Sequence, residues 1–145
     1  MKIRSILCLY LLMACNSKEE VDENLAFDIS INQQWKLTKM TGGLSGTEAV
    51  GDEMEWQETY FFNTDLSFSK TRVSDGTSIR ATGTFEIEEK GNELLLQLRY
   101  PEESTIAGSC FGQEIEVLVV RNQQKSLEST WLACDGPGLF YERQN

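Results

Sequence analysis

The feature that most constrains the fold is a repeated two-residue alternation of apolar and polar side chains. It is longest over residues 79–88, where one face carries Ile79, Ala81, Gly83, Phe85 and Ile87 and the other Arg80, Thr82, Thr84, Glu86 and Glu88. This period is typical of a β-strand with one buried face. No long helical stripe occurs after the first residues of the chain. We therefore expect an all-β fold.

About eight strands are predicted, at residues 35–40, 58–63, 66–70, 79–88, 94–100, 115–119, 127–131 and 139–142. Short turn sequences separate them, and Ser74-Asp75-Gly76 is a strong hairpin signal. On the strand at 115–119 we expect the valines to face inward and Glu116 to face solvent. Eight antiparallel strands can close into an up-and-down barrel without exposed edges, which is our prediction, or form a β-sandwich, which is the alternative.

The start of the chain predicts export. Lys2 and Arg4 precede an apolar run that is too short to span a bilayer, which is typical of a cleaved signal. The run closes on Leu12-Met13-Ala14-Cys15, which resembles the lipobox of bacterial lipoproteins. The resemblance implies removal of residues 1–14 and lipidation of Cys15, so that the protein would be anchored without a spanning segment. An ordinary signal peptide is the alternative.

Residues 15–27 are predicted to form an acidic tether and residues 28–145 the folded domain. Asn16 stands where some lipoproteins carry an inner-membrane retention aspartate, so the outer membrane of a Gram-negative bacterium is favoured. Residues 17–20 resemble an acidic surface-export tag, but a solvated acidic linker explains them equally well. The periplasmic or surface-exposed face therefore stays open.

The composition argues against several function classes. The net charge is −10, and loss of Lys2 and Arg4 with the signal makes it −12. Such acidity disfavours nucleic acid and anionic headgroups as partners. The chain has no histidine, and we find no nucleophile motif. We expect no catalytic residues, no metal, no cofactor and no enzymatic activity. Seven glutamates alternate with apolar residues and are interpreted as an outer face: Glu53, Glu55, Glu58, Glu86, Glu88, Glu114 and Glu116.

Two cysteines remain in the folded domain once Cys8 leaves with the signal and Cys15 is lipidated. Disulfides persist outside the cytoplasm, so Cys110 and Cys134 are predicted to pair. They lie at similar distances on either side of the turn at Asn122, and a hairpin there would bring them together. Closing a loop of about 25 residues contributes about 3.5 kcal/mol on the chain-entropy model.

Several phrases resemble the bacterial lipocalin-like lipoprotein family. They are Gln34-Trp35-Lys36-Leu37, residues 60–68, the pair 83–87 and 91–94, and Tyr141-Glu142-Arg143. The resemblance implies an eight-stranded barrel that opens at Trp35, and Arg143 packed over Trp35 as a cation–π pair. Two positions depart from the family pattern: Gln33 and Leu66 stand where glycine is usual.

Two functions remain open, and the resemblance favours the first. The first is binding of a small apolar ligand in the barrel, in a cavity lined by Trp35, Phe62, Phe68, Phe85, Leu96, Val117 and Trp131. The alternative is an interaction module with a solid core, which contacts another envelope protein or a polysaccharide through its loops. Small barrels are either filled by side chains or hold one ligand, so the pattern leaves both open. The glycine-rich segment 40–54 is either a lid over the barrel mouth or a simple connection.

Overall fold

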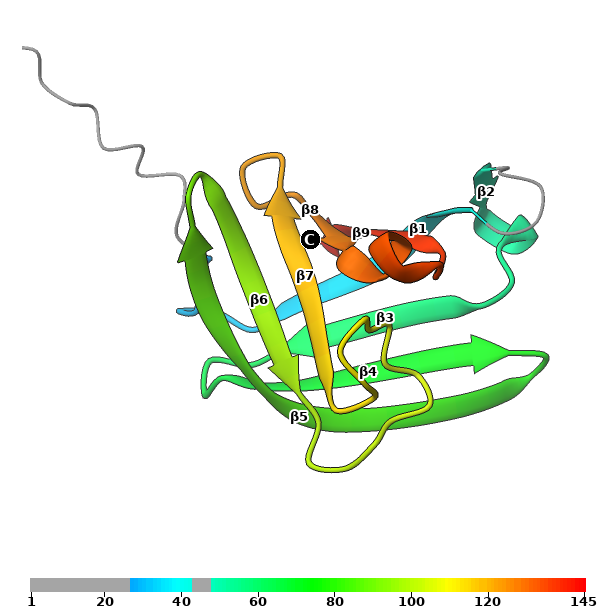
Figure 1. Cartoon of the computed structure of the whole chain (residues 1–145), viewed down its shortest axis with the longest axis horizontal. Coiled ribbons are helices and arrows are strands. Elements are labelled where there is room, and N and C mark those ends of the chain that lie inside the picture. The colour runs from blue at the N-terminus through cyan, green and yellow to red at the C-terminus, as the bar shows by residue number, and fades with distance from the viewer. Residues whose placement is uncertain (1–26, 43–47) are drawn as a thin grey trace, which may run out of the picture.

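The structure is a computed structural model, and it describes residues 27–42 and 48–145. Cys15, the signal and most of the tether lie outside the described residues, so lipidation stays a prediction. Within the described ranges the strands form one antiparallel sheet in the order β2-β1-β3-β4-β5-β6-β7-β8-β9, and β9 pairs back onto β1. Eight strands therefore close a barrel and β2 adds to its edge, which confirms the predicted fold class (Figure 1).

The strands are β1 (Gln33–Thr41), β2 (Glu48–Val50), β3 (Gln57–Phe62), β4 (Ser67–Ser74), β5 (Thr77–Lys90), β6 (Glu93–Arg99), β7 (Ile115–Arg121), β8 (Ser126–Ser129) and β9 (Gly138–Gln144). Two short 3-10 helices are η1 (Gly51–Glu53) and η2 (Thr130–Cys134). None of the helices in the described part is long and apolar enough to cross a membrane.

Two boundaries differ from the prediction. The strand expected to run through Trp131 ends at Ser129, because the Ser129 hydroxyl accepts a hydrogen bond from the Trp131 N–H and starts η2. Within the glycine-rich segment, β2 pairs with the end of β1 and is followed by η1. No regular element was predicted there, since three residues are too few for an alternation to be recognised.

The phase of β7 is opposite to the prediction. Glu116 and Leu118 are fully buried and pair with Leu98 and Leu96 of β6, whereas Val117 between them is only partly buried. Val117 therefore lies on the outer face of β7 and does not line the interior. This strand is apolar on both faces, so the alternation of apolar residues does not show which face points inward. The prediction therefore followed Glu116 alone and assigned its face to solvent.

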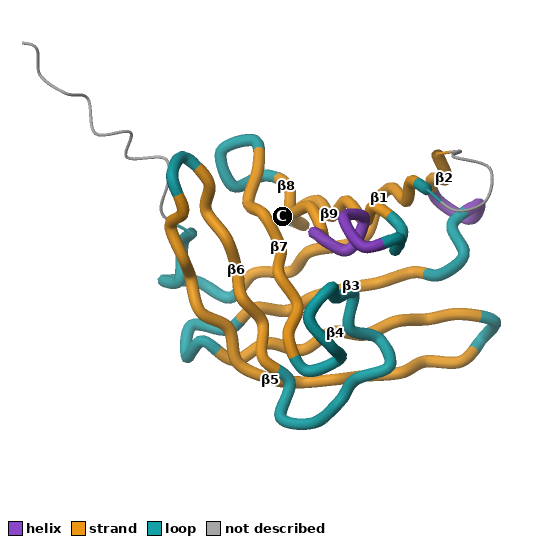
Figure 2. The backbone as a smooth tube through the Cα atoms, viewed as in Figure 1, coloured by secondary structure: helices purple, strands orange, loops and turns teal. Residues whose placement is uncertain are grey.

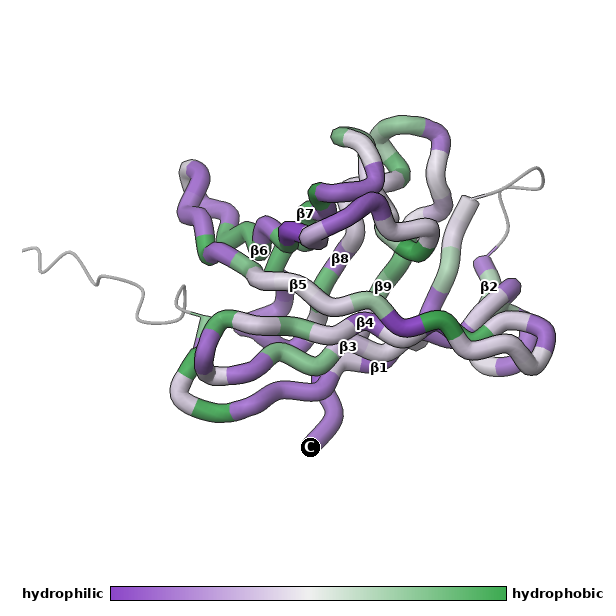
Figure 3. Tube along the Cα trace, turned by 90° about the horizontal axis from the view of Figure 1, so that it is seen from below, coloured by the Kyte–Doolittle hydropathy of each residue, from purple (hydrophilic) through white to green (hydrophobic). Residues whose placement is uncertain are grey.

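One end of the barrel interior is filled by an aromatic cluster. Its members are Phe27, Trp35, Tyr60, Phe62, Phe68 and Phe85, all at most 4% exposed, with neighbouring ring centroids 5.0–6.5 Å apart. Phe27 enters ahead of β1 and contacts three of these rings. The folded core thus begins at the last residue assigned to the tether. Figure 3 shows hydrophilic and hydrophobic residues alternating along β5. Of the face predicted to point inward only Phe85 is buried, whereas Ile79 and Ile87, toward the two ends of this long strand, are exposed.

The closure of the barrel places Trp35 and Arg143 opposite each other on β1 and β9. Their predicted cation–π contact is nevertheless not among those formed by the described residues. The Trp35 ring is fully buried, and its Nε1 donates to Gln33 Oε1 at 3.1 Å. Gln33, which replaces the family's glycine, is thus the indole's polar partner. Leu66, the other departure, adopts φ = 64°, the left-handed region that favours glycine.

The opposite end of the barrel is covered by what we call the cap, residues 101–114 together with η2. Figure 2 shows the loop between β6 and β7 beside η2. The predicted disulfide joins the two parts, with Cys110 and Cys134 Cα atoms 5.7 Å apart. Ile106 of the cap is 1% exposed. The disulfide prediction is therefore confirmed, and the bond holds the cap together over the barrel.

Candidate functional site

Beneath the cap the barrel interior contains four ionisable side chains, which we call the charge network. Its members are Glu58 on β3, Lys70 and Arg72 on β4, and Glu116 on β7. The side chains of Glu58, Lys70 and Glu116 are 0% exposed and that of Arg72 is 14% exposed. Their formal charges cancel, so the barrel encloses two carboxylates and two cations without a net charge.

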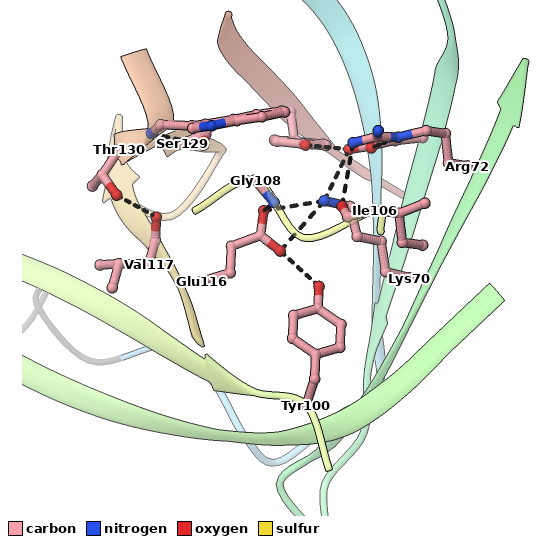
Figure 4. Close-up of polar contacts among 12 residues, drawn as sticks. Lys70, Arg72, Tyr100, Ile106, Gly108, Glu116, Val117, Ser129 and Thr130 are labelled. Atoms are coloured by element: carbon pink, nitrogen blue, oxygen red, sulfur yellow. Dashed lines mark hydrogen bonds and ion pairs between the residues drawn. The ribbon is translucent and has the colours of Figure 1, made fainter. Parts of the chain in front are cut away.

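Lys70 lies at the centre of the network. Its Nζ is 3.1 Å from Glu116 Oε1 and 3.3 Å from Glu58 Oε2 (Figure 4). Arg72 extends the chain of ion pairs, since its Nε lies 2.5 Å from Glu58 Oε1. The Arg72 guanidinium also stacks on Trp56, 4.2 Å from the ring centroid. Each buried charge therefore has an opposite charge within hydrogen-bond distance, as a buried ion requires.

A tyrosine hydroxyl donates a further hydrogen bond to each of the two carboxylates. The Tyr100 hydroxyl donates to Glu116 Oε2 at 2.6 Å, and the Tyr141 hydroxyl donates to Glu58 Oε2 at 2.5 Å. Tyr60 packs against Lys70, whose Nζ is 5.0 Å from the ring centroid. Burial and the neighbouring carboxylates raise the pKa of each of these phenols above its usual value near 10. We call Tyr60, Tyr100 and Tyr141 the buried tyrosines.

The cap completes the network through its backbone. The Gly108 N–H donates to Glu116 Oε1 at 3.1 Å, and the Ile106 carbonyl accepts from Arg72 Nη2 at 3.2 Å. A Cβ at Gly108 would lie 2.9 Å from Glu116 Oε1 and 3.0 Å from the Trp131 ring, so glycine permits this close approach. The cap is therefore fixed in two ways, by the disulfide and by hydrogen bonds to buried charges.

Two buried polar groups beside the network have no hydrogen-bond partner among the described residues. They are the Tyr60 hydroxyl and the Nε1 N–H of Trp56, the ring on which Arg72 stacks. An unpaired buried hydroxyl is costly, and an ordered water is the usual partner in such a place.

The predicted cavity residues fall into two groups. Trp35, Phe62, Phe68, Phe85 and Leu96 meet in the core, each at most 2% exposed. Val117 faces outward, as described above, and Trp131 lies in the cap, where Gly136 leaves room for its ring. Four pockets are open to the surface, and of the five buried side chains only Phe68 lines one of these four.

The charge network was missed in the sequence, and two of its members were assigned to the wrong face. Glu58 and Glu116 were interpreted as solvent-facing, but both are buried. A signal was present on two strands: Glu58 is two residues before Tyr60, and Lys70 two after Phe68, so period two places both on the inward face. The prediction instead followed the general rule that charged side chains face water, and so placed the glutamates on the outer face.

The described residues contain no group of three or more acidic, cysteine or histidine side chains arranged to hold a metal ion. Comparison of the chain with protein-family models, with curated proteins and with solved structures found no match in any of the three.

Proposed function

We propose that this protein is a lipid-anchored envelope protein whose barrel is a solid scaffold for recognising another envelope component through its outer surface and loops. The observation that carries the proposal is the filled interior. Aromatic rings occupy one half, and a neutral, cross-linked charge network occupies the other. An apolar ligand would have to displace closely packed rings or separate buried ion pairs, and either is costly.

The anchor and location form the other part of the proposal. Cys15 would carry the lipid and hold the protein at the outer membrane, without any catalytic activity. The membrane would then be one partner and the recognised envelope component another. A Cys15→Ala variant tests the anchor: it should lose incorporation of labelled palmitate and appear in the detergent-free soluble fraction. Palmitate labelling that survives this substitution would contradict the anchor.

The filled interior is tested by native mass spectrometry of residues 16–145, produced in an oxidising compartment and kept free of detergent. We expect the mass of the bare, disulfide-bonded chain. A bound mass that is released on denaturation would contradict the solid-scaffold proposal. Phe85→Ala supplies a positive control, because removing a ring that is 2% exposed leaves an apolar cavity able to take up benzene.

A second candidate, binding of a small ligand inside the barrel, is favoured by one observation. The Tyr60 hydroxyl has no hydrogen-bond partner among the described residues, and its ring packs against Lys70, so a compact polar group at this hydroxyl would gain a hydrogen bond. The same mass measurement separates the two candidates. A Tyr60→Phe variant identifies the position, since a ligand held there should bind more weakly to it.

A further inference from the structure

One sheet edge of the barrel is open along the first half of β5. The pairing of β5 with β4 covers Thr77 to Thr84, whereas its pairing with β6 begins only at Thr84. Beyond that point β6 ends and the chain turns into the cap. Figure 1 shows β6 ending beside the middle of the long, curved β5, whose first half runs on beside β4. The stretch from Thr77 to Gly83 thus has a neighbouring strand on one side only.

Backbone hydrogen-bonding groups point out of this edge. In an antiparallel ladder successive residues direct their N–H and C=O alternately to the two sides. The Phe85 N–H donates to Leu66 at the β4 side, so the odd-numbered residues of this stretch also face β4. Ser78, Arg80 and Thr82 therefore point their backbone groups toward the open side. Within the described part of the chain, no hydrogen bond reaches these backbone groups from outside β5.

A groove follows the open edge. Two pockets, of about 480 and 280 Å³, meet at Arg80, Thr82, Tyr100 and Pro101. The outer face of β5 forms one wall of the larger pocket, and the start of the cap forms part of the other. The groove thus runs between the unpaired backbone and the start of the cap, where an additional strand would lie.

The charges of this groove are unevenly distributed. Arg80 and Arg99 are exposed and line the larger pocket, and the described residues that line it include no aspartate or glutamate. Glu102 and Glu103 line the smaller pocket, so the positive charge lies at the end of the groove nearest Arg99. Neither arginine belongs to an ion pair formed by the described residues. At the larger pocket these two guanidinium groups lie beside backbone groups that no other described residue pairs with, and together they are complementary to an extended peptide that carries carboxylates.

We propose that an acidic segment of a partner protein binds here as an added strand, paired with residues 78–82 of β5. The inference rests on the proposed function and names the partner of the scaffold's outer surface. Residues of the added strand opposite Arg80 and Thr82 place their side chains on the same outer face as those two residues. Acidic residues two positions apart in the partner would therefore meet Arg80 and Arg99, while its backbone pairs with β5.

The test is a titration of residues 16–145 with a short synthetic peptide in which glutamate alternates with valine and threonine. We expect saturable binding that weakens with added salt. Replacing the glutamates by glutamine should weaken binding at least about tenfold, which corresponds to about 1.4 kcal/mol. Methylating alternate backbone nitrogens of the peptide, so that its N–H groups cannot pair with β5, should abolish binding although the charge is unchanged.

Variants of the protein locate the site. Arg80→Glu with Arg99→Glu should lower affinity at least about tenfold. Lys36→Glu with Lys90→Glu makes the same change in net charge at exposed positions outside the groove, and should lower affinity less than about threefold. Thr82→Pro removes an outward N–H that no strand uses, so it should abolish binding while the fold, followed by circular dichroism, remains.

Absence of peptide binding, equal binding of the N-methylated peptide, or equal loss in the two charge-reversed pairs would overturn the inference. If Thr82→Pro fails to fold, the N-methylated peptide tests the same hydrogen bonds from the other side. The result of the peptide titration does not depend on whether the barrel interior holds a ligand. A bare native mass with no peptide binding refutes the edge site and leaves the solid-scaffold proposal standing, whereas a releasable interior ligand refutes the scaffold alone.

Discussion

Replacing Lys70 by methionine is the sharpest perturbation of the charge network. Methionine retains much of the side-chain length and removes the charge, so the packing around Tyr60 changes little. The variant leaves Glu58, Glu116 and Arg72 in the interior, which makes one carboxylate uncompensated. Removing one partner of a buried pair typically costs about 3–5 kcal/mol, against a total stability of about 5–15 kcal/mol for a domain.

The double variant Lys70→Met with Glu116→Gln tests whether this loss comes from the charge imbalance. It removes one charge of each sign, and the amide oxygen introduced by Glu116→Gln can still accept a hydrogen bond from Gly108 or Tyr100, the partners of the native carboxylate. The Glu58–Arg72 pair is then left intact and neutral. We expect the double variant to be more stable than the sum of the single losses predicts, by about 2–3 kcal/mol, within the range of coupling between contacting residues.

The assay is equilibrium urea unfolding at neutral pH, followed by tryptophan fluorescence. Lys36→Met, an exposed change on β1, is the matched control and should alter stability by less than about 0.5 kcal/mol. A loss below about 1 kcal/mol for Lys70→Met, or strict additivity in the double variant, would refute the view that these ion pairs hold the capped end together.

Three further predictions concern the cap and the core. The buried tyrosines are protonated below pH 10 in both the folded and the unfolded chain. Above pH 10 they ionise only in the unfolded chain, because the fold raises their pKa, so the free energy of unfolding should fall by up to about 4 kcal/mol per pH unit. Absorbance should show all three tyrosinates forming together with unfolding, and ionisation near pH 10 in an intact fold would contradict this. Replacing Cys110 and Cys134 by serine should cost about 3.5 kcal/mol and speed amide exchange at Gly108, whereas unchanged exchange would show that the disulfide does not hold the cap. Gly83→Ala should cost at least about 1–3 kcal/mol in urea unfolding, because its Cβ would meet the Arg99 carbonyl and the Phe68 ring, and a neutral result would contradict this packing.

The sequence predicted the barrel well because its signals are local. The alternation over residues 79–88 defines β5, and Asp75 and Gly76 form the tight turn before it, both with positive φ. The disulfide followed from compartment and from the positions of the two cysteines. All of these features can be recognised within a short stretch of chain, without knowing which strands meet across the interior.

The charge network could not be predicted in the same way, because its stability is a property of distant pairs. Glu116 is buried only since Lys70, 46 residues earlier, and Tyr100 meet it across the barrel. A one-strand pattern assigns an unpaired glutamate to solvent, which is correct for most glutamates. The prediction that Trp131 lies on a strand was wrong for another reason. The Ser129 hydroxyl accepts a hydrogen bond from the Trp131 N–H and ends the strand, and such a bond does not alter the alternation of apolar and polar residues.

The position of Phe27 shows which end of the barrel lies nearest the predicted lipid anchor. Its ring is packed into the end opposite the cap, and it is both the last residue of the predicted tether and the first that the structure describes. If Cys15 is held in a bilayer as proposed, this end is tied to the membrane by a dozen residues. The cap and the hairpin turn at Asp75 would then point outward, which makes the open edge of β5 one of the surfaces that an approaching protein would meet first.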